Sequence, residues 1–207
     1  MDDETAPDLR ERRRRETLAE ISEAALALFE RAGFDSTTVD DIAKASGVSV
    51  RTCFRYFPTK DSYVFVPYEP FDVRFDAWLA DVDRERPLIA QLEEVHESAI
   101  DHLASEASSA DLDRMVRVRR LVSGEPNLKL AAISRDIEHS YDYIQRVQAA
   151  FDGTVTEREA RLALEVVGSG LRAAFDEWFD TGDPTRPEQL VAIYADVRRA
   201  LHALIAS

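Results

Sequence analysis

The chain has 207 residues, a formal net charge of −14 at pH 7, 45% hydrophobic residues and a single cysteine. This length is enough to bury a core and corresponds to one or two domains. One cysteine cannot form an internal disulfide, and no apolar run approaches the ~20 residues of a membrane span. We therefore expect a cytoplasmic protein without a membrane partner. Few glycines and prolines, with long windows rich in Ala, Leu, Glu and Arg, predict an all-α fold.

The negative charge is distributed unevenly. The stretch from Leu9 to Lys60 contains ten Lys and Arg against eight Asp and Glu, a net charge of +2, whereas Asp61 to Ser207 has sixteen against twenty-eight, a net charge of −12. Residues 1–9 are acidic and polar, and we expect them to be disordered. A basic run, Arg12 to Arg15, follows just before the first predicted helix. It is either a contact to a polyanion or a solvated helix end.

The first strongly periodic segment, residues 17–31, predicts an amphipathic helix that Gly33 ends. Thr38 and Asp41 then form a capping-box pattern at the start of a second helix. Gly47 supplies the break after that helix, because glycine tolerates the left-handed conformation.

Ser49 is placed to cap a third helix that runs through Arg55. Two short helices around a tight turn form a helix-turn-helix, whose second helix enters the major groove of DNA. Thr59 is predicted to cap the next helix. The small core of this head is predicted to comprise Ile21, Leu28, Phe34, Val39, Ile42, Val48 and Phe57.

Two prolines, Pro67 and Pro70, interrupt the helical pattern after Lys60. Each removes a backbone donor, so the pattern predicts either a kinked helix or a loop between two independent helices. Further helices are predicted over residues 87–107, 111–122, 127–151, 156–180 and 187–205.

The last two predicted helices carry more apolar residues than one buried face requires. We expect one apolar face of these helices to be buried inside the subunit and another to be buried across a two-fold axis, which gives a four-helix bundle between subunits. The cluster Gly168-Ser169-Gly170 indicates either close helix approach or room for a ligand. The predicted dimer interface is Leu171, Phe175, Leu190, Tyr194, Val197 and Leu201.

Motifs of catalysis and metal binding are missing from the sequence. His96 and His102 are six residues apart, which does not place both on one helix face, and no HExxH, CxxC, GxSxG or P-loop pattern occurs. We expect no metal, no cofactor and no enzymatic activity. A packing role is expected for Cys53.

The head resembles the DNA-binding domain of the TetR family of bacterial transcriptional regulators. The resemblance covers about residues 12–64 and rests on the pattern AALALFERAGF, then TTV with IA, then GVS followed by F-YFP-K. It implies that Arg51 and Thr52 read base edges and that Val50 contacts a thymine methyl group. The predicted DNA-binding residues are Arg12, Arg13, Arg14, Thr38, Ser49, Val50, Arg51, Thr52, Phe54, Arg55, Tyr56 and Lys60.

The stretches MVRVRRLVSGEPNLKLAAI and GLRAAFDEWFDTGD are also similar to an actinobacterial group that includes the mycofactocin-system regulator. That similarity suggests an acyl-CoA or other lipid-like effector with arginine partners for its phosphates, although a solvated arginine is the alternative. The predicted pocket residues are Phe71, Phe75, Trp78, Arg117, Arg120, Tyr141 and Trp178.

Together these features predict a tail over residues 1–9, a DNA-binding domain over 10–60 and a ligand-binding and dimerisation domain over 61–207. The family implies a homodimeric, ligand-responsive regulator, usually a repressor, that binds an inverted-repeat operator in double-stranded DNA in the bacterial nucleoid. A helical adaptor or ligand-binding protein that does not bind DNA is the alternative. The effector, the operator and the choice between repression and activation are left open.

Overall fold

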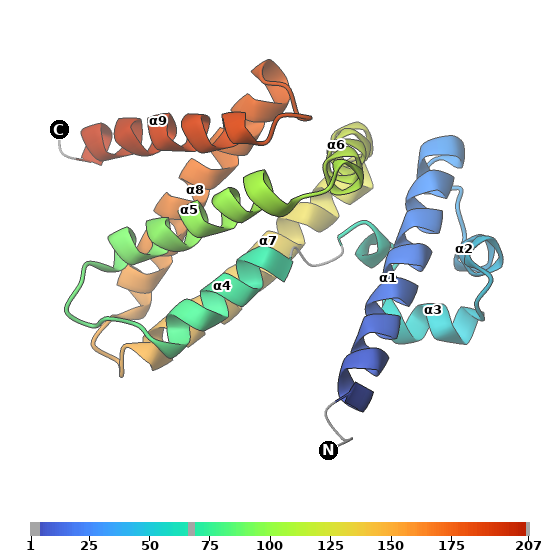
Figure 1. Ribbon diagram of the computed structural model, residues 1–207, viewed down its shortest axis with the longest axis horizontal. Helices are drawn as coiled ribbons and strands as arrows, with labels where there is room; N and C mark the ends of the chain where they lie inside the picture. The colour runs from blue at the N-terminus through green and yellow to red at the C-terminus, as the bar shows by residue number, and fades with distance from the viewer. Residues whose placement is uncertain (1–4, 66–68, 206–207) are drawn as a thin grey trace. The chain divides into compact units, whose positions relative to one another are not determined.

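The computed structural model describes the backbone of residues 5–65 and 69–205, and the side chains of these residues except 5–11, 15, 69, 70 and 136. Over the described ranges the chain forms helices and no strand, which confirms the all-α prediction. None of the described helices is long and apolar enough to cross a membrane. The elements, labelled in Figure 1, are α1 (Thr5–Ala32), α2 (Val39–Ser46), α3 (Val50–Tyr56), the 3-10 helix η1 (Asp61–Tyr63), α4 (Glu69–Ala80), α5 (Leu88–Glu106), α6 (Ser109–Gly124), α7 (Pro126–Ala150), α8 (Glu157–Thr181) and α9 (Glu188–Ile205).

The chain divides into two compact units. The first, which we call the head, contains the chain up to Val66 together with Val118–Ala132; the second, the body, contains Pro67–Arg117 and Ile133–Ser207. Helices α6 and α7 therefore each contribute residues to both units. This division differs from the predicted boundary after residue 60, because residues 61–65 and 118–132 belong to the compact head.

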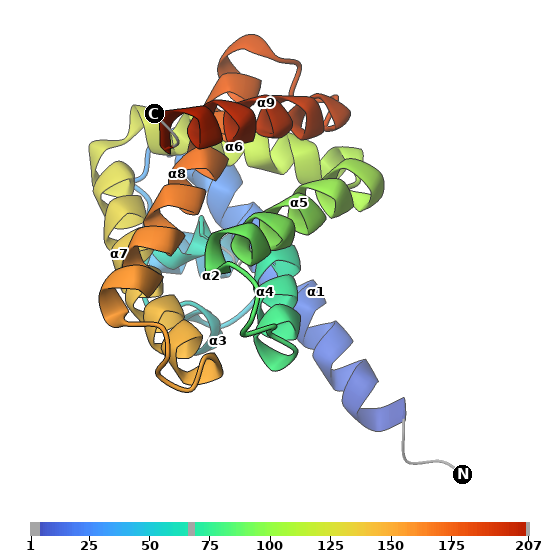
Figure 2. The ribbon, with the colours of Figure 1, turned by 90° about the vertical axis from the view of Figure 1, so that its left-hand side faces the viewer.

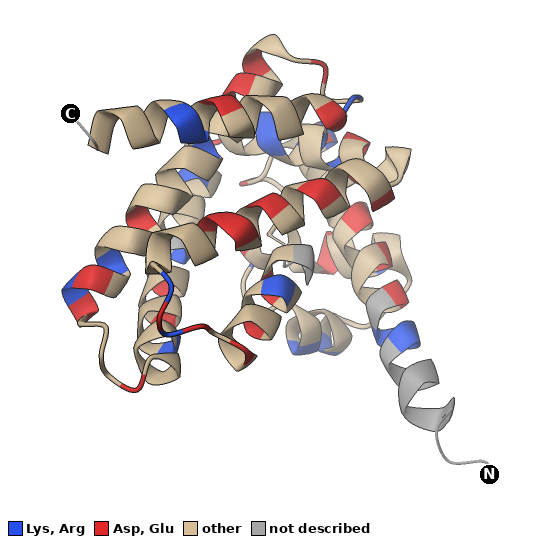
Figure 3. Cartoon of the chain, turned by 60° about the vertical axis from the view of Figure 1, so that its left-hand side comes forward, with Lys and Arg blue, Asp and Glu red and all other residues tan. Residues whose placement is uncertain are grey.

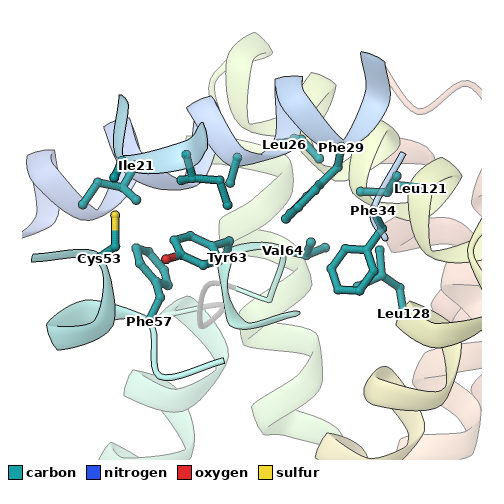
Figure 4. Close-up of a cluster of buried hydrophobic side chains, with 13 residues drawn as sticks. Ile21, Leu26, Phe29, Phe34, Cys53, Phe57, Tyr63, Val64, Leu121 and Leu128 are labelled. Atoms are coloured by element: carbon teal, nitrogen blue, oxygen red, sulfur yellow. The ribbon is translucent and has the colours of Figure 1, made fainter. Parts of the chain in front are cut away.

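A continuous apolar core explains why the head is larger than the predicted domain that ends at residue 60 (Figure 4). Ile21 and Phe29 of α1 are buried against residues of the helix-turn-helix and η1. Leu121 of α6 and Leu128 of α7 are buried in the same cluster. Of the seven predicted core residues, Ile21, Phe34, Ile42 and Phe57 are buried, and Leu28, Val39 and Val48 pack partly buried against them.

Helix α1 is longer than its periodic segment predicted. It begins at Thr5, so residues 5–9, for which we expected disorder, are helical, and residues 1–4 lie outside the described range. Pro7 does not prevent this, because proline is tolerated in the first turn of a helix. The basic run therefore lies about two turns inside α1 rather than at its start.

The segment after the helix-turn-helix corrects one prediction. Thr59 does not cap a helix; the short η1 begins at Asp61, its N-cap is Lys60, and no side chain caps it. Separate elements, η1 and α4, stand where the prolines of the sequence predicted a kink or a break. Helix α4 begins at Glu69 with Pro70 in its first turn, where the missing N–H costs little.

In the body, α5 packs against α4, α8 and α9, and α8 packs against α9 (Figure 2). The predicted start of α8 is confirmed, because Thr156 and Glu159 form a capping box there. Buried Gln91 joins α5 to the preceding loop through hydrogen bonds to Asp83 and to the indole of Trp78. Helix α5 carries several acidic residues (Figure 3). One of them, Glu93, is buried and paired with His202 of α9.

Candidate nucleic-acid interface and effector site

Local hydrogen bonds set the geometry of the helix-turn-helix. Thr38 caps α2: its hydroxyl accepts from the Asp41 N–H at 3.2 Å, and the Asp41 carboxylate accepts from the Thr38 N–H at 3.0 Å. The hydrogen bonds from Thr38 also hold the pKa of Asp41 below its ordinary value. Gly47 ends α2 with φ +69°, in the left-handed region, and Ser49 caps α3 by accepting from the Thr52 N–H at 3.1 Å. All of these predictions are confirmed.

The recognition helix α3 has one anchored and one presented face. Cys53 and the following Phe57 are buried in the head core. Arg51, Phe54 and Arg55 are exposed, and Phe54 leaves 53% of its surface open. Because α3 contains two arginines and no acidic residue, its presented face is cationic (Figure 3).

Side chains on α3 also contact one another. The Arg55 guanidinium donates to the Tyr56 hydroxyl at 2.9 Å and lies over the Tyr56 ring at 4.6 Å from its centroid. The hydroxyls of Ser49 and Thr52 are 2.8 Å apart. These contacts restrict the rotamers of the groups that would meet the nucleic acid, which lowers the entropy cost of binding.

Lys60 has a different environment from the one predicted. Its ammonium donates to the carbonyls of Phe34, Asp35 and Thr37 at 2.8, 3.4 and 3.2 Å, and lies 4.3 Å from the centroid of the Phe34 ring. An ammonium group has three N–H donors, and three carbonyls already surround this one. The structure therefore places Lys60 as a clamp on the α1–α2 loop.

Arg12, Arg13 and Arg14 of the basic run are exposed on α1, and the side chain of Arg15 lies outside the described ones. Arg12 pairs with Glu16 one turn further along the helix at 3.0 Å, and the backbone carbonyl of Arg13 accepts from the Thr17 hydroxyl. Exposed i, i+4 pairs contribute little to stability, so DNA phosphates would compete readily for Arg12.

An aromatic cluster forms the candidate effector site in the body. Phe71, Phe75 and Trp78 of α4 lie together, and Tyr143 of α7 packs on Phe75 with ring centroids 4.5 Å apart. The Tyr143 hydroxyl donates to Asp72 at 2.7 Å.

His96 of α5 is buried beside this cluster, 5.1 Å from Phe71 between ring centroids. Burial lowers the pKa of His96 to about 4, so the ring is neutral at pH 7. The sequence predicted a structural or solvent-facing histidine at His96 rather than a metal ligand, and it did not place His96 beside the aromatic residues. The cluster is mostly apolar with a few polar groups, which is the usual composition of small-molecule sites.

The other predicted pocket residues do not join this cluster. Trp178 is buried in a separate core with Leu190 and Tyr194, and Tyr141 is exposed on the outside of α7. Arg117 lies 3.7 Å from Asp113 on its own helix, and Arg120 is an exposed residue of the head. Among the side chains that the structure describes, no three His, Cys, Asp or Glu are arranged to hold a metal ion.

The predicted dimer residues pack inside the subunit. Leu190 and Tyr194 are buried, and Leu171, Phe175 and Val197 pack partly buried on the same core. Leu201 of α9 faces Gly170 of α8. A side chain that is buried in one subunit offers no surface to another, so Leu190 and Tyr194 are withdrawn from the interface. Leu190 and Tyr194 serve the packing of α9 within the chain, whereas Val191, Leu204 and Ile205 of α9 are exposed.

Sequence reasoning missed the contribution of the α6–α7 connection to the head. The Glu125 carboxylate accepts from the Phe34 N–H at 3.3 Å, and the Asn127 amide donates to Asp35 at 3.1 Å. Their partners, the Phe34 N–H and the Asp35 carboxylate, belong to the loop that Lys60 also holds. Nothing local in the sequence signals these contacts, because the partners are 91 and 92 residues apart.

A capped helix pair that presents a cationic recognition helix from its own core defines a helix-turn-helix DNA-binding protein. Comparison with known proteins shows which helix-turn-helix proteins this chain is similar to. Residues 21–64 match the family model described as bacterial regulatory proteins, tetR family. Over 184 residues the chain is 29% identical to the HTH-type transcriptional regulator TcmR of Streptomyces glaucescens, covering 86% of this chain and 79% of TcmR.

Two further comparisons also find transcriptional regulators. A stretch of 60 residues, 29% of each chain, is 43% identical to MftR of Mycobacterium tuberculosis, provisionally described as a mycofactocin biosynthesis transcriptional regulator. A solved structure from Mesorhizobium loti MAFF303099, provisionally described as a TetR-family transcriptional regulator, has the same fold (TM-score 0.51, 20% identity, 91% of this chain and 96% of that one). The chain is thus similar to TetR-family transcriptional regulators, most clearly over residues 21–64. This similarity supports a DNA-binding transcriptional regulator.

Proposed function

We propose that the protein is a homodimeric repressor that binds an inverted-repeat operator in double-stranded DNA and leaves it when a small effector binds the body. The observation that carries this proposal is the recognition helix, whose Arg51, Phe54 and Arg55 are exposed while Cys53 anchors it in the head core. The site of action is the bacterial cytoplasm, at the nucleoid.

The proposed contacts follow the geometry of α3. Arg51 and Thr52 read base edges, with Arg51 bidentate to a guanine, and Val50 contacts a thymine methyl group. Phe54, Arg55 and Tyr56 lie against the sugar-phosphate backbone, joined by the capping hydroxyls of Thr38 and Ser49. Arg12, Arg13 and Arg14 of α1 add phosphate contacts. The function of Lys60 is to hold the loop rather than to bind phosphate.

The proposed effector is a small apolar or acyl-CoA-like molecule that enters the aromatic cluster of Phe71, Phe75, Trp78 and Tyr143. Its binding separates α4 from α5 and α7. Helices α6 and α7 each have residues in both units, so a shift in the body is carried to the α1–α2 loop through Glu125 and Asn127. Two heads must match half-sites about 34–36 Å apart, so a small change in their spacing releases both.

The test is selection of binding sequences from a random double-stranded DNA library by the full-length protein. Inverted repeats should be enriched, and affinity should fall steeply with salt. Arg51→Ala should cost about 1–3 kcal/mol in affinity and relax specificity at one base pair of each half-site. Arg199→Ala is the matched control, because Arg199 is an exposed arginine of α9 that pairs with Asp196 one turn before it.

Enrichment of no sequence at low salt would overturn the proposal in favour of a helical adaptor or ligand-binding protein. Equal binding by Arg51→Ala and Arg199→Ala variants, with unchanged specificity, would remove Arg51 from base readout while leaving DNA binding intact.

A further inference from the structure

A tyrosine hydroxyl is buried in the head without a hydrogen-bond partner. Tyr63 of η1 is fully buried in the head core. The Ser22 hydroxyl donates to the Tyr63 carbonyl at 2.6 Å, and the Tyr63 ring stacks on Phe57 with centroids 4.4 Å apart. The Tyr63 hydroxyl itself makes no hydrogen bond to any residue that the structure describes. Such a buried group is rare in folded proteins, because nothing replaces its lost hydration, and it requires an explanation.

This hydroxyl points toward Cys53 of the recognition helix α3 (Figure 4). Cys53 is fully buried and is the single cysteine of the chain. Burial raises the pKa of the Tyr63 phenol, and the neighbouring Cys53 raises it further, so the phenol keeps its proton at pH 7. A thiol sulfur is only a weak acceptor. The head therefore holds a fixed O–H donor beside a sulfur atom that does not use it.

We propose that Cys53 is an oxidation site, which a hydroperoxide converts to a sulfenic acid, and that the Tyr63 hydroxyl donates to the oxygen atom added there. In this step the sulfur forms a bond to one peroxide oxygen and the O–O bond breaks. The sulfur loses two electrons and the peroxide gains them. With hydrogen peroxide as the oxidant, the thiol proton leaves with the second oxygen as water.

The oxidised form has no internal route back to the thiol. The chain contains no second cysteine, so the sulfenic acid cannot condense with another thiol of the same chain. It lasts until two external thiols reduce it, which yields their disulfide and water. The hydrogen bond from Tyr63 stabilises the sulfenic acid during that time.

Oxidation of Cys53 alters the DNA-binding surface from the buried side of α3. Cys53 belongs to the same core as Ile21 and Phe57, and a close-packed core accommodates an added oxygen only by moving its neighbours. Arg51 and Thr52 belong to the same seven-residue helix, so they move with it. A displaced α3 takes the base-reading side chains out of register, and DNA is released. Only this consequence rests on the proposed function, because the chemical step does not involve DNA.

The oxidant reaches the thiol when α3 opens. A buried cysteine is inert while the head is closed. Helix α3 spans only about two turns, and its detachment is a local opening that leaves the rest of the head folded. When α3 closes again, the Tyr63 hydroxyl meets the added oxygen. DNA that holds α3 closed protects Cys53, so the site responds to hydroperoxide in the free regulator.

Mass spectrometry of the full-length protein treated with hydrogen peroxide tests the chemical step. The folded protein should gain one oxygen at Cys53 that dimedone traps and that an external thiol removes. In Tyr63→Phe, which loses the hydroxyl and keeps the ring, thiol should reduce the sulfenic acid about two- to tenfold faster, as expected for one net hydrogen bond. Tyr141→Phe removes an exposed hydroxyl in the body and is the matched control, with a reduction rate equal to that of the unaltered protein.

DNA binding supplies the second readout. Peroxide should weaken binding of the unaltered protein to its selected inverted repeat by roughly tenfold or more, and thiol should restore it. The same duplex, added before the peroxide, should slow oxidation of Cys53. Cys53→Ala keeps both methionines of the chain, Met1 and Met115, and its affinity should not change with peroxide, whatever its initial value.

Each alternative outcome is distinct. If dimedone labels Cys53 in urea but not in the folded protein, the inference is overturned and DNA binding is unaffected. Equal reduction rates for Tyr63→Phe and the unaltered protein overturn the role of the hydroxyl. A loss of affinity by Cys53→Ala on peroxide treatment assigns the effect to methionine and also overturns the inference. A protein that binds no duplex contradicts the proposed function, and labelling of Cys53 then decides the inference by itself.

Discussion

Truncation of Leu128 tests whether the start of α7 belongs to the DNA-binding head. Leu128 is fully buried in the cluster that contains Phe29, Phe34 and Leu121. Replacing a fully buried leucine by alanine costs about 2–5 kcal/mol, through lost burial and the cavity left behind. Leu130, two residues along the same helix, is 64% exposed, and Leu130→Ala should change stability by less than about 0.5 kcal/mol. The two substitutions have the same helix propensity effect, so their difference isolates the burial.

The readout has to be local, because a chain with two compact units need not unfold in one step. Amide hydrogen exchange of α1, α2 and α3 in the full-length protein reports the opening free energy of the head itself. A loss of 2 kcal/mol or more corresponds to exchange faster by roughly 30-fold or more in those helices. Leu130→Ala should leave their exchange unchanged.

The opposite pattern would refute the reasoning. If Leu128→Ala accelerates exchange only in α6 and α7, and α1 to α3 keep their protection, the head folds independently of α7 and ends near residue 60, as the sequence predicted. Equal effects of Leu128→Ala and Leu130→Ala would likewise show that burial of Leu128 does not stabilise the head.

Three further substitutions have defined outcomes. Lys60→Met removes the ammonium from three loop carbonyls and should destabilise the head by about 1–3 kcal/mol in denaturant titration, with an unchanged midpoint contradicting the clamp. Gly182→Ala places a Cβ 2.6 Å from the Trp178 carbonyl oxygen and should destabilise the body by about 1–3 kcal/mol; undiminished stability would show that the turn adjusts freely. His96→Gln removes a group whose pKa is about 4 in the folded chain against 6.5 in the unfolded one. The stability that neutral His96 contributes is present above pH 6.5 and is lost as the pH falls towards 4, and the loss is at most about 3 kcal/mol. The denaturation midpoint of the variant should therefore depend less on pH between 6.5 and 4 than the midpoint of the original protein.

The helix-turn-helix was predictable because its determinants are local. The Thr38–Asp41 box, the left-handed Gly47 and the Ser49 cap each involve residues no more than four apart, and their conformational and hydrogen-bonding preferences are visible in the residue types. The amphipathic period of α1 was visible for the same reason. Its first turns were not, because they lack an apolar stripe and depend on propensity alone.

Long-range partners could not be predicted in this way. The sequence marks Lys60 as a cation near a DNA-binding motif, but its carbonyl partners are up to 26 residues away. The aromatic cluster shows the same limit. The α4 stripe of Phe71, Phe75 and Trp78 follows from spacing, whereas its closure by Tyr143 and His96 depends on how α5 and α7 return to α4.

Helix α7 shows why an apolar stripe does not identify its own partner. The sequence presents one long amphipathic helix, yet Leu128 and Ile137 point to opposite sides of it, nine residues and about two and a half turns apart. Leu128 is buried in the head, whereas Ile137 is exposed on the body. If the two sites serve different contacts, they should respond independently. Ile137→Asp should leave amide exchange in α1 to α3 unchanged, because Ile137 is exposed, whereas Leu128→Ala should accelerate exchange in those helices. Val73→Asp, at an exposed valine of α4, controls for the added charge. Coupled responses from both substitutions would mean that α7 acts as one structural unit and that its two faces cannot be assigned separately.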